Sequence, residues 1–278
     1  MHIKIFEFHG GLGNQIFEYI YLQYLKKMFP NYVFYSYFFD KKNWLHNGFE
    51  LDRWFKVDIP PTSLKTDLVA FFCYQLSRIQ RRLYIKLPFN FSSDDYNLNE
   101  NKLFHQGWYQ DKRYFLAVGA PLFKDDIIIN DKNKSVLQAI TKANSVAIHI
   151  RRGDFLLPKN SKALGGICTK KYYDNAIRKI KEFIDSPHFF FFSDDIEFVE
   201  NEFNDLDKTV INWNTGENSF YDLYLMAHAS NMILANSTFS CCAAYLNKDT
   251  RYVLCPPMWN KLLNPDLNLE QWIVINNN

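Results

Sequence analysis

A short apolar run that is followed directly by charged residues constrains the fold of this chain more than any other feature. Residues 145–150 read S-V-A-I-H-I, and residues 151–154 read R-R-G-D. Such a run is typical of a strand buried on both faces. Open α/β sheets bind ligands beyond the carboxyl ends of these strands. Because the planar guanidinium of arginine can make two charge-assisted hydrogen bonds to one phosphate, we expect an anionic ligand here rather than a solvated surface ion pair.

The same alternation of strand, polar loop and helix recurs through the second half, as in a doubly wound sheet. Two further apolar runs end in the polar clusters Ser193-Asp194-Asp195 and Asn236-Ser237-Thr238-Phe239-Ser240. Carboxyl ends of parallel strands lie at one edge of a sheet, so we expect all three loops to converge there. Arginine and hydroxyl groups suit a diphosphate, and carboxylates suit ribose hydroxyls or guanine. The expected strands are 189–192, 210–213, 231–235 and 252–255, and the expected helices are 168–184, 196–202, 219–229 and one from 241.

A glycine-rich turn follows the first predicted strand, residues 3–8. Residues 9–15 read H-G-G-L-G-N-Q and lead into a helical pattern. This arrangement brings backbone N–H groups close to a phosphate or sugar, so Gly11 and Gly13 are candidates for ligand contact. The turn lacks the G-x-G-x-x-G of dinucleotide sites and the ending of a P-loop, and a plain tight turn is the alternative. The amides of Asn14 and Gln15 are able to meet hydroxyl groups.

The run Trp108-Tyr109-Gln110 presents aromatic and amide groups at the predicted end of another strand. Aromatic residues make up 18% of the chain, but they fill cores as well as sugar sites, so this excess does not decide between the two. A helix predicted over 120–144 leads into the second half. The 278 residues fit two domains, which we place at 1–140 and 141–278, with the C-terminal tail packing back on the first.

Charge and cysteine usage narrow the classes of partner. A net charge of +2 is too balanced to indicate nucleic acid, and the five scattered cysteines lack metal-binding spacing and fit reduced thiols. With no secretion signal and no apolar run near the ~20 residues that span a bilayer, we expect a cytoplasmic protein.

A helical pattern over 64–85 ends in a basic amphipathic stretch. A solvated face is the default there, and contact with the inner membrane face is a hypothesis that rests on Arg78, Arg81, Arg82 and Lys86.

Six motifs, in order along nearly the whole chain, resemble those of glycosyltransferase family 11. This family comprises the bacterial α1,2-fucosyltransferases, and its wider superfamily includes the α1,6- and protein-O-fucosyltransferases. The motifs H-x-R-R-G-D and N-S-[ST]-F-S are highly specific when they occur together at this spacing. The six are G-G-L-G-N-Q-I-F (10–17), G-W-Y-Q-D-K-R-Y-F (107–115), H-I-R-R-G-D-F (149–155), F-F-S-D-D (191–195), Y-D-L-Y-L-M (221–226) and N-S-T-F-S (236–240).

The resemblance implies an α/β fold of GT-B type, with two Rossmann-like domains facing across a cleft. It also implies inverting transfer from GDP-fucose without a metal or cofactor, with the acceptor mainly on the first domain and the donor on the second. Arg151 is the implied ligand of the β-phosphate, and Asn14 is expected near the fucose. The other implied contacts are His149 and Asp222 near guanine, Asp194 and Asp195 at the guanosine end, and Thr238 and Ser240 on the phosphates, with Ser237, Phe239, Gly11 and Gly13 beside them and Arg152 and Asp154 completing the first motif.

The general base and one local departure stay open at this stage. Inversion requires a group that takes the acceptor proton, and His9, Glu18, His46 and Asp154 are all candidates. Where the family has bulky aromatics after N-S-[ST]-F-S, this chain has Cys241-Cys242. Two small buried thiols that fill helix space are favoured over a vicinal redox pair.

The leading hypothesis is transfer of L-fucose in α1,2 linkage to a terminal galactose of a surface glycan precursor, an oligosaccharide or a lipid-linked glycan. A second is an inverting transferase that uses another GDP-sugar or linkage. A dinucleotide-dependent oxidoreductase is disfavoured by the missing G-x-G-x-x-G. A non-catalytic sugar-binding protein would have no need for Arg151 within a complete diphosphate pocket.

Overall fold

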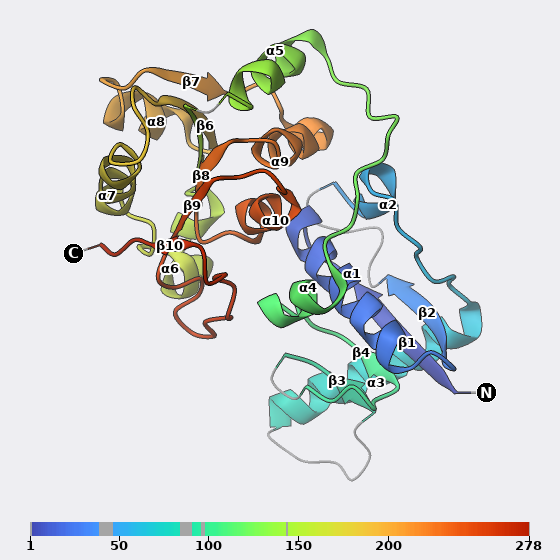
Figure 1. Cartoon of the computed structure of the whole chain (residues 1–278). Coiled ribbons are helices and arrows are strands. Elements are labelled where there is room, and N and C mark those ends of the chain that lie inside the picture. The colour runs from blue at the N-terminus through green and yellow to red at the C-terminus, as the bar shows by residue number, and fades with distance from the viewer. Residues whose placement is uncertain (1, 39–46, 84–90, 96–97, 143, 278) are drawn as a thin grey trace. The chain divides into compact units, whose positions relative to one another are not determined.

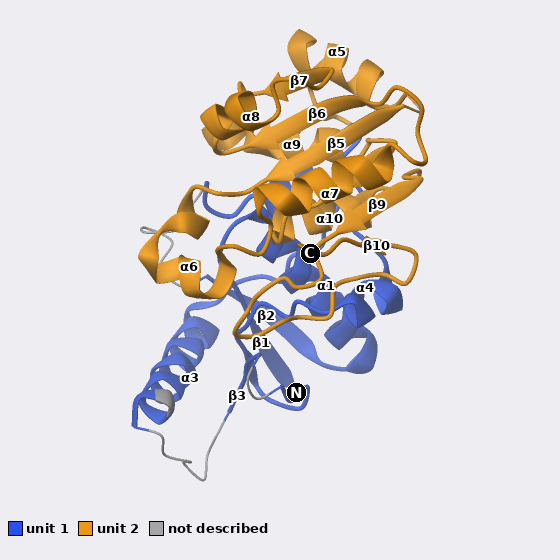
Figure 2. Ribbon diagram, turned by 90° about the vertical axis from the view of Figure 1, so that its left-hand side faces the viewer, with its two compact units in different colours: residues 1–125 blue, residues 126–278 orange. Residues whose placement is uncertain are grey.

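The computed structural model describes residues 2–38, 47–83, 91–95, 98–142 and 144–277 (Figure 1). The chain forms two compact units, residues 1–125 and 126–278, which Figure 2 colours separately. Helix α5 (Asp131–Ile140) packs against α9 (Phe220–Met226) and β5 (Ser145–Ile150) of the second unit. The boundary between the units therefore precedes α5, whereas the sequence placed it after residue 140. The helix expected over 120–144 is confined to α5.

The N-terminal unit contains a four-stranded parallel sheet in the order β2-β1-β4-β3. The central strand β1 is buried along nearly its whole length, and α1 follows it after the glycine turn. The strands are β1 (Ile3–Phe8), β2 (Val33–Phe38), β3 (Ser92–Ser93) and β4 (Phe104–His105), and the helices are α1 (Leu12–Met28), α2 (Leu51–Trp54), α3 (Leu64–Leu83) and α4 (Lys112–Val118).

The C-terminal unit contains a six-stranded parallel sheet in the order β10-β9-β8-β5-β6-β7. Its strands are β5 (Ser145–Ile150), β6 (His188–Ser193), β7 (Lys208–Ile211), β8 (Asn231–Ile233), β9 (Tyr252–Cys255) and β10 (Ile273–Val274). Its other helices are α6 (Pro158–Leu164), α7 (Lys170–Ile180), α8 (Ile196–Glu202), α9 (Phe220–Met226) and α10 (Thr238–Leu246), with 3₁₀ turns at Asp154–Leu156 and Gly216–Ser219.

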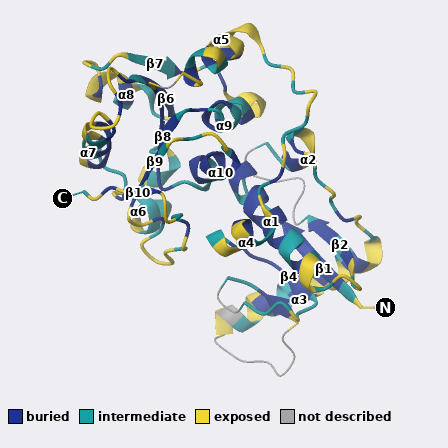
Figure 3. Cartoon of the chain, viewed as in Figure 1, coloured by how far each residue is buried: buried dark blue, intermediate teal, exposed yellow. Residues whose placement is uncertain are grey.

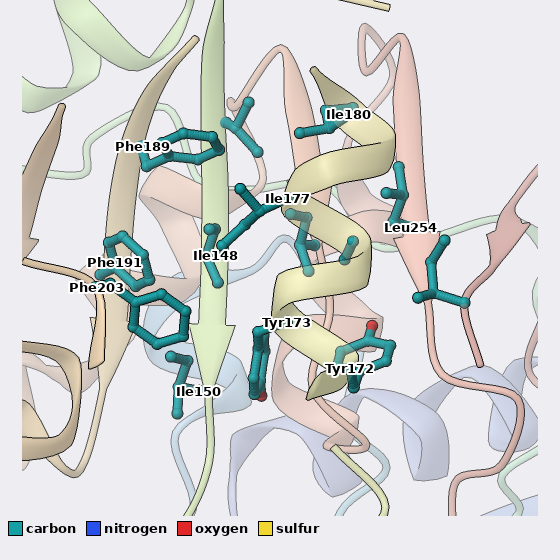
Figure 4. Packing of buried hydrophobic residues seen from close by; sticks show 14 of the residues in the cluster. Ile148, Ile150, Tyr172, Tyr173, Ile177, Ile180, Phe189, Phe191, Phe203 and Leu254 are labelled. Atoms are coloured by element: carbon teal, nitrogen blue, oxygen red, sulfur yellow. The ribbon is translucent and has the colours of Figure 1, made fainter. Parts of the chain in front are cut away.

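The core of the C-terminal unit forms where α7 packs on the sheet, as Figure 4 shows. Tyr172, Tyr173 and Ile177 of α7 contact a face built by Ile148 of β5 and Phe191 of β6. The two tyrosine hydroxyls are satisfied, because they donate to the carbonyls of Leu234 and His149. Figure 3 shows how burial is distributed in each unit: the strands of the sheet are buried, and the outer faces of the helices are exposed.

The sequence predicted the buried strands best, because a short run of apolar residues is typical of a strand buried on both faces. β9 and α8 have the expected bounds, whereas β7 begins two residues earlier and α10 begins at Thr238 rather than at 241. Strand β10 was not predicted, and residues 273–274 pair with β9 in the sheet of their own unit. Cys241 and Cys242 are buried free thiols within α10, and burial raises their pKa values, which favours the packing role.

Candidate functional site

Three loops lie at the carboxyl edge of the second sheet, after the neighbouring strands β5, β6 and β8. This is the convergence that the sequence predicted. The Arg151 guanidinium donates to Asp154 from Nε (2.9 Å) and Nη2 (2.8 Å), and its Nη1 lies 3.2 Å from Asp194 Oδ2. These contacts use three of the five N–H donors of an arginine, so two remain for a ligand.

The second arginine of the motif, Arg152, contacts the start of helix α8. Arg152 Nε donates to Asp195 Oδ2 at 2.8 Å, and its guanidinium lies 3.8 Å from the centre of the Phe198 ring. The hydrogen bond from Arg152 holds the pKa of the Asp195 carboxyl below its usual range. The other oxygen of Asp195 accepts from the Phe198 N–H and caps α8. The contact with Asp195 uses one of the five N–H donors of Arg152, and guanidinium donors are suited to an anion.

Gly153 is required by the close approach of the two loops. A Cβ atom at this position would lie 2.8 Å from Asp194 Oδ2, inside van der Waals contact. Asp194 also accepts the Arg152 backbone N–H at 2.9 Å, so its carboxylate is fixed by both arginines. The glycine therefore allows the loop after β5 to lie directly against the loop after β6.

His149 lies at the end of β5 and is only 7% exposed. Burial and the neighbouring charge of Arg151 lower the pKa of His149 to about 4, so the imidazole is neutral at pH 7. Its Nδ1 is buried and has no hydrogen-bond partner within the protein. The ring centre lies 5.8 Å from that of Phe239. An orphaned ring nitrogen beside an aromatic face suits a heterocyclic ligand, in keeping with the expected guanine contact.

The loop after β8 combines structural and exposed positions. Asn236 is buried and donates to the carbonyls of Leu164 and Trp259. Ser237 caps α10, whose first residues, Thr238 and Phe239, are half-buried. Ser240 is fully buried and donates to the carbonyls of Ala235 and Ser237. Its hydroxyl is engaged inside the fold, and the expected contact of Ser240 with a phosphate stays a prediction.

Asp222 belongs to a buried polar network that the sequence did not reveal. Its carboxylate accepts from Asn214 at 2.8 Å, and Asn214 pairs reciprocally with Asn133. Trp213 Nε1 also donates to Asn133, at 2.9 Å. Burial raises the pKa of Asp222 to about 7. Asn133 lies on α5, about 90 residues along the chain from Asp222, which is why no local pattern indicated the network.

In the N-terminal unit, the glycine turn after β1 is held by Gln15. This fully buried side chain donates to the carbonyls of Gly10 and Gly48 and accepts from the backbone N–H groups of Glu50 and Leu51. The expectation that Gln15 meets a ligand hydroxyl is wrong, because all of its hydrogen-bonding capacity fixes the loop. Asn14, by contrast, is half-buried and accepts from Gln110 Nε2 at 3.1 Å. Gly11 is the N-cap residue of α1, and Gly13 is buried in its first turn.

The candidate bases differ in accessibility. Glu18 is fully buried, with Oε1 2.7 Å from His9 Nδ1, and the His9 side chain is 29% exposed. Burial alone would lower the pKa of His9, but Glu18, with smaller contributions from Glu7 and Asp95, raises it to about 9. Burial raises the pKa of Glu18 to about 7 despite His9. Asp154 is engaged by Arg151, and His46 lies outside the described residues.

The basic end of the predicted helix over 64–85 is only partly described. Arg78 and Arg82 are exposed on α3, whereas Lys86 and the side chain of Arg81 lie outside the described residues. No helix in the described parts of the chain is both long and apolar enough to cross a membrane. Among those same residues, no cluster of three or more His, Cys, Asp or Glu side chains is arranged to hold a metal ion.

Comparison with known proteins places these features in one family. The sequence model of glycosyl transferase family 11 matches residues 5–276. An α1,2-colitosyltransferase of Escherichia coli is 32% identical over 293 aligned residues, covering 99% of both chains. The O-antigen biosynthesis glycosyltransferase WbnK, also of Escherichia coli, is 35% identical over 134 residues, which cover 47% of this chain and 44% of WbnK.

Similarity to solved structures concerns the fold alone. The fucosyltransferase NodZ from Bradyrhizobium has a TM-score of 0.50 at 11% identity, covering 88% of this chain and 93% of NodZ. POFUT1 in complex with GDP has a TM-score of 0.49 at 12% identity, covering 92% of this chain and 98% of POFUT1. The α/β architecture with two parallel sheets is of the GT-B type, as expected. With a family match over nearly its whole length, this chain belongs to glycosyl transferase family 11 and is a glycosyltransferase.

Proposed function

We propose that this protein transfers L-fucose from GDP-fucose, with inversion and without a metal, to a terminal galactose in α1,2 linkage. The acceptor is an oligosaccharide or lipid-linked precursor of a surface glycan. The observation that carries the proposal is the pair Arg151 and Arg152 at the carboxyl edge of the second sheet, beside the start of α10. Both arginines keep N–H donors that can grip a diphosphate, and the N-terminus of α10 favours negative charge.

The chemical role of the arginines follows from the charge that develops. Departure of GDP places negative charge on the β-phosphate as the bond to C1 of the sugar breaks. Fixed guanidinium donors stabilise that charge without reorganising, and the loss of one such donor costs on the order of 100- to 1000-fold in turnover. Asp194 holds both arginine positions, so the site is organised before the donor binds. The neutral His149 is suited to hydrogen bonding with guanine.

A specific observation favours a second donor. The relative with 32% identity is an α1,2-colitosyltransferase, and colitose differs from L-fucose in lacking the 3-hydroxyl group. GDP-colitose would present the same diphosphate and guanine to the same residues. The two donors are therefore separated at the sugar and not at the nucleotide.

The test is release of GDP in EDTA from GDP-fucose, GDP-colitose and GDP-mannose, with and without a panel of terminal β-galactosides. We expect acceptor-dependent release that falls about 100- to 1000-fold in Arg151→Ala. The matched control is Arg178→Ala, which removes an exposed arginine from α7. NMR of the product gives the linkage. If none of the three donors is turned over, the proposed function fails, and loss of release in EDTA would overturn metal independence.

We also propose that α3 rests on the anionic inner face of the membrane, where a lipid-linked acceptor would lie. Thr66, Ala70, Cys73 and Ser77 form the buried face of this helix. The outer face exposes large apolar side chains and ends in Arg78 and Arg82, which is the pattern of an interfacial helix. The exposed apolar side chains are Leu64, Leu68, Val69, Phe71, Phe72, Ile79 and Leu83, and Phe72 is 60% exposed.

Co-sedimentation with vesicles tests this contact. Binding to phosphatidylcholine vesicles that contain phosphatidylglycerol should exceed binding to phosphatidylcholine alone, and it should fall in Phe72→Ser and in Arg78→Glu/Arg82→Glu. The control Lys132→Glu/Lys134→Glu makes the same charge change on exposed positions of α5. Binding that ignores the anionic lipid would remove the support for this proposal.

A further inference from the structure

The carboxyl edge of the first sheet carries a cluster of two rings and two amides. His9 follows β1, Asn14 lies in the first turn of α1, and Trp108 and Gln110 follow β4. We infer that this cluster, which we call the ring–amide cluster, is the subsite that holds the acceptor pyranose. The inference rests on the proposed transfer reaction and assigns its second substrate.

Trp108 supplies a partly open aromatic surface. The residue is 37% exposed, and its ring centre lies 3.9 Å from that of His9. A Cβ atom on Gly10 would lie 2.7 Å from Trp108 Cζ3, so the indole lies directly on the glycine backbone. Aromatic rings held in this way pack against the apolar C–H face of a pyranose.

The backbone that carries Trp108 is fixed from both sides. The Asp95 carboxylate accepts from the N–H groups of Trp108 and Tyr109, both at 2.8 Å. Tyr109 has φ = +48°, an unfavourable conformation for a residue with a side chain. Its buried ring stacks on Tyr21, with ring centres 3.8 Å apart, and its hydroxyl donates to the Ser93 carbonyl. Such strain persists where a site must hold a side chain in place, and here that side chain is Trp108.

The amides beside the indole are suited to hydroxyl groups. Gln110 Nε2 donates to Asn14 Oδ1 at 3.1 Å, which orients both side chains. Gln110 Oε1 then remains as an acceptor, and Asn14 Nδ2 remains as a donor. A donor and an acceptor beside an aromatic face form the usual pattern for recognition of a neutral sugar.

The charges around the cluster distinguish an acceptor sugar from the donor. His9 is paired with Glu18, and Glu7 and Asp95 add negative charge nearby. The surroundings are therefore neutral to acidic and would repel a diphosphate. The arginines that suit the diphosphate lie on the other sheet. An uncharged galactoside is the ligand class that fits the ring–amide cluster.

The test compares Trp108→Ala and Trp108→Phe with the wild type, using methyl β-D-galactopyranoside as the acceptor probe. We expect Trp108→Ala to raise the acceptor KM about 10-fold and Trp108→Phe to raise it less, since stacked rings contribute on the order of 1 kcal/mol. The KM for GDP-fucose and acceptor-independent release of GDP should not change. Gln110→Ala should raise the acceptor KM with Trp108 intact, which guards against a folding defect. Phe91→Ala is the matched control, because it removes another exposed ring of the same unit.

An unchanged acceptor KM in both Trp108→Ala and Gln110→Ala overturns the subsite while leaving the transfer reaction standing. A raised GDP-fucose KM in place of the acceptor KM overturns it as well. The proposed function fails separately, when the wild type turns over no GDP-sugar. In that case, saturation-transfer NMR with the same galactoside still tests the subsite, and a signal that survives in Trp108→Ala contradicts it.

Discussion

The two sheets of this protein have the same architecture, but the loops at their carboxyl edges carry different kinds of side chain. Each is parallel, and in each a central buried strand runs into a glycine-containing loop. The loop after β5 presents two guanidiniums held by three aspartates, whereas the loop after β1 lies among rings and amides. The comparison teaches that the fold supplies a binding edge, and the few residues beyond the strand decide which ligand that edge accepts.

The largest expected effect comes from changing the geometry of the charged edge while keeping its charge. Arg151→Lys retains one positive charge but loses the planar fork that contacts Asp154 and Asp194. We expect kcat to fall about 100-fold, as measured by GDP release under donor saturation. Arg178→Lys on α7 serves as the control. Activity within threefold of wild type would show that charge alone suffices.

The second-largest effect is expected at the loop after β1, whose conformation is held by the buried side chain of Gln15. Gln15→Ala leaves the carbonyls of Gly10 and Gly48 and the N–H groups of Glu50 and Leu51 without partners. Because each buried unsatisfied group costs about 1–3 kcal/mol, the free energy of unfolding should fall by at least about 2 kcal/mol in urea titrations. Asn14→Ala, one residue away and half-exposed, is the control and should change stability little. Equal stabilities of the two variants would contradict the structural role.

Two glycine-to-alanine substitutions compare how much space the loops after β1 and β5 leave for a Cβ atom. Gly10→Ala places a Cβ atom 2.7 Å from a rigid indole at φ = +75°, whereas Gly153→Ala meets a carboxylate at 2.8 Å with no such φ. We expect Gly10→Ala to lower the free energy of unfolding by about 1–3 kcal/mol. Gly153→Ala should lower it less and instead weaken GDP binding, as followed by calorimetry. The reverse ranking would contradict this account.

The smallest effect concerns pH. The pKa of Glu18 is raised from 4.5 to about 7, and that of His9 from 6.5 to about 9. Both groups hold protons more tightly in the folded state, so their contribution to stability is complete below the unfolded values and is lost as the pH rises through about 7 and then about 9. In His9→Gln/Glu18→Gln, the fall in unfolding free energy between pH 7 and 9 should become shallower. An unchanged slope would mean that other groups control it.

The sequence predicted the parts of the molecule that depend on local pattern. Apolar runs marked β5, β6 and β9, and the polar residues after them marked the charged edge, because strand ends of a parallel sheet share one side. The role of Gln15 could not be predicted, since its partners at Gly48, Glu50 and Leu51 lie more than thirty residues away. The Asn133–Asp222 network and the pairing of β10 are equally non-local.

The pairing at the far end of the chain bears on the order in which the C-terminal unit can form. Thr169, the N-cap of α7, donates to Asn277 across 108 positions of sequence, and Asn277 donates to the Ile167 carbonyl. The Ile275 N–H donates to Cys255, which extends the sheet edge. During synthesis on the ribosome, α7 and its strands therefore emerge long before these partners exist. The unit can acquire its final edge only after residues 273–277 have left the exit tunnel, and a nascent chain arrested before them would expose β9 as an open strand.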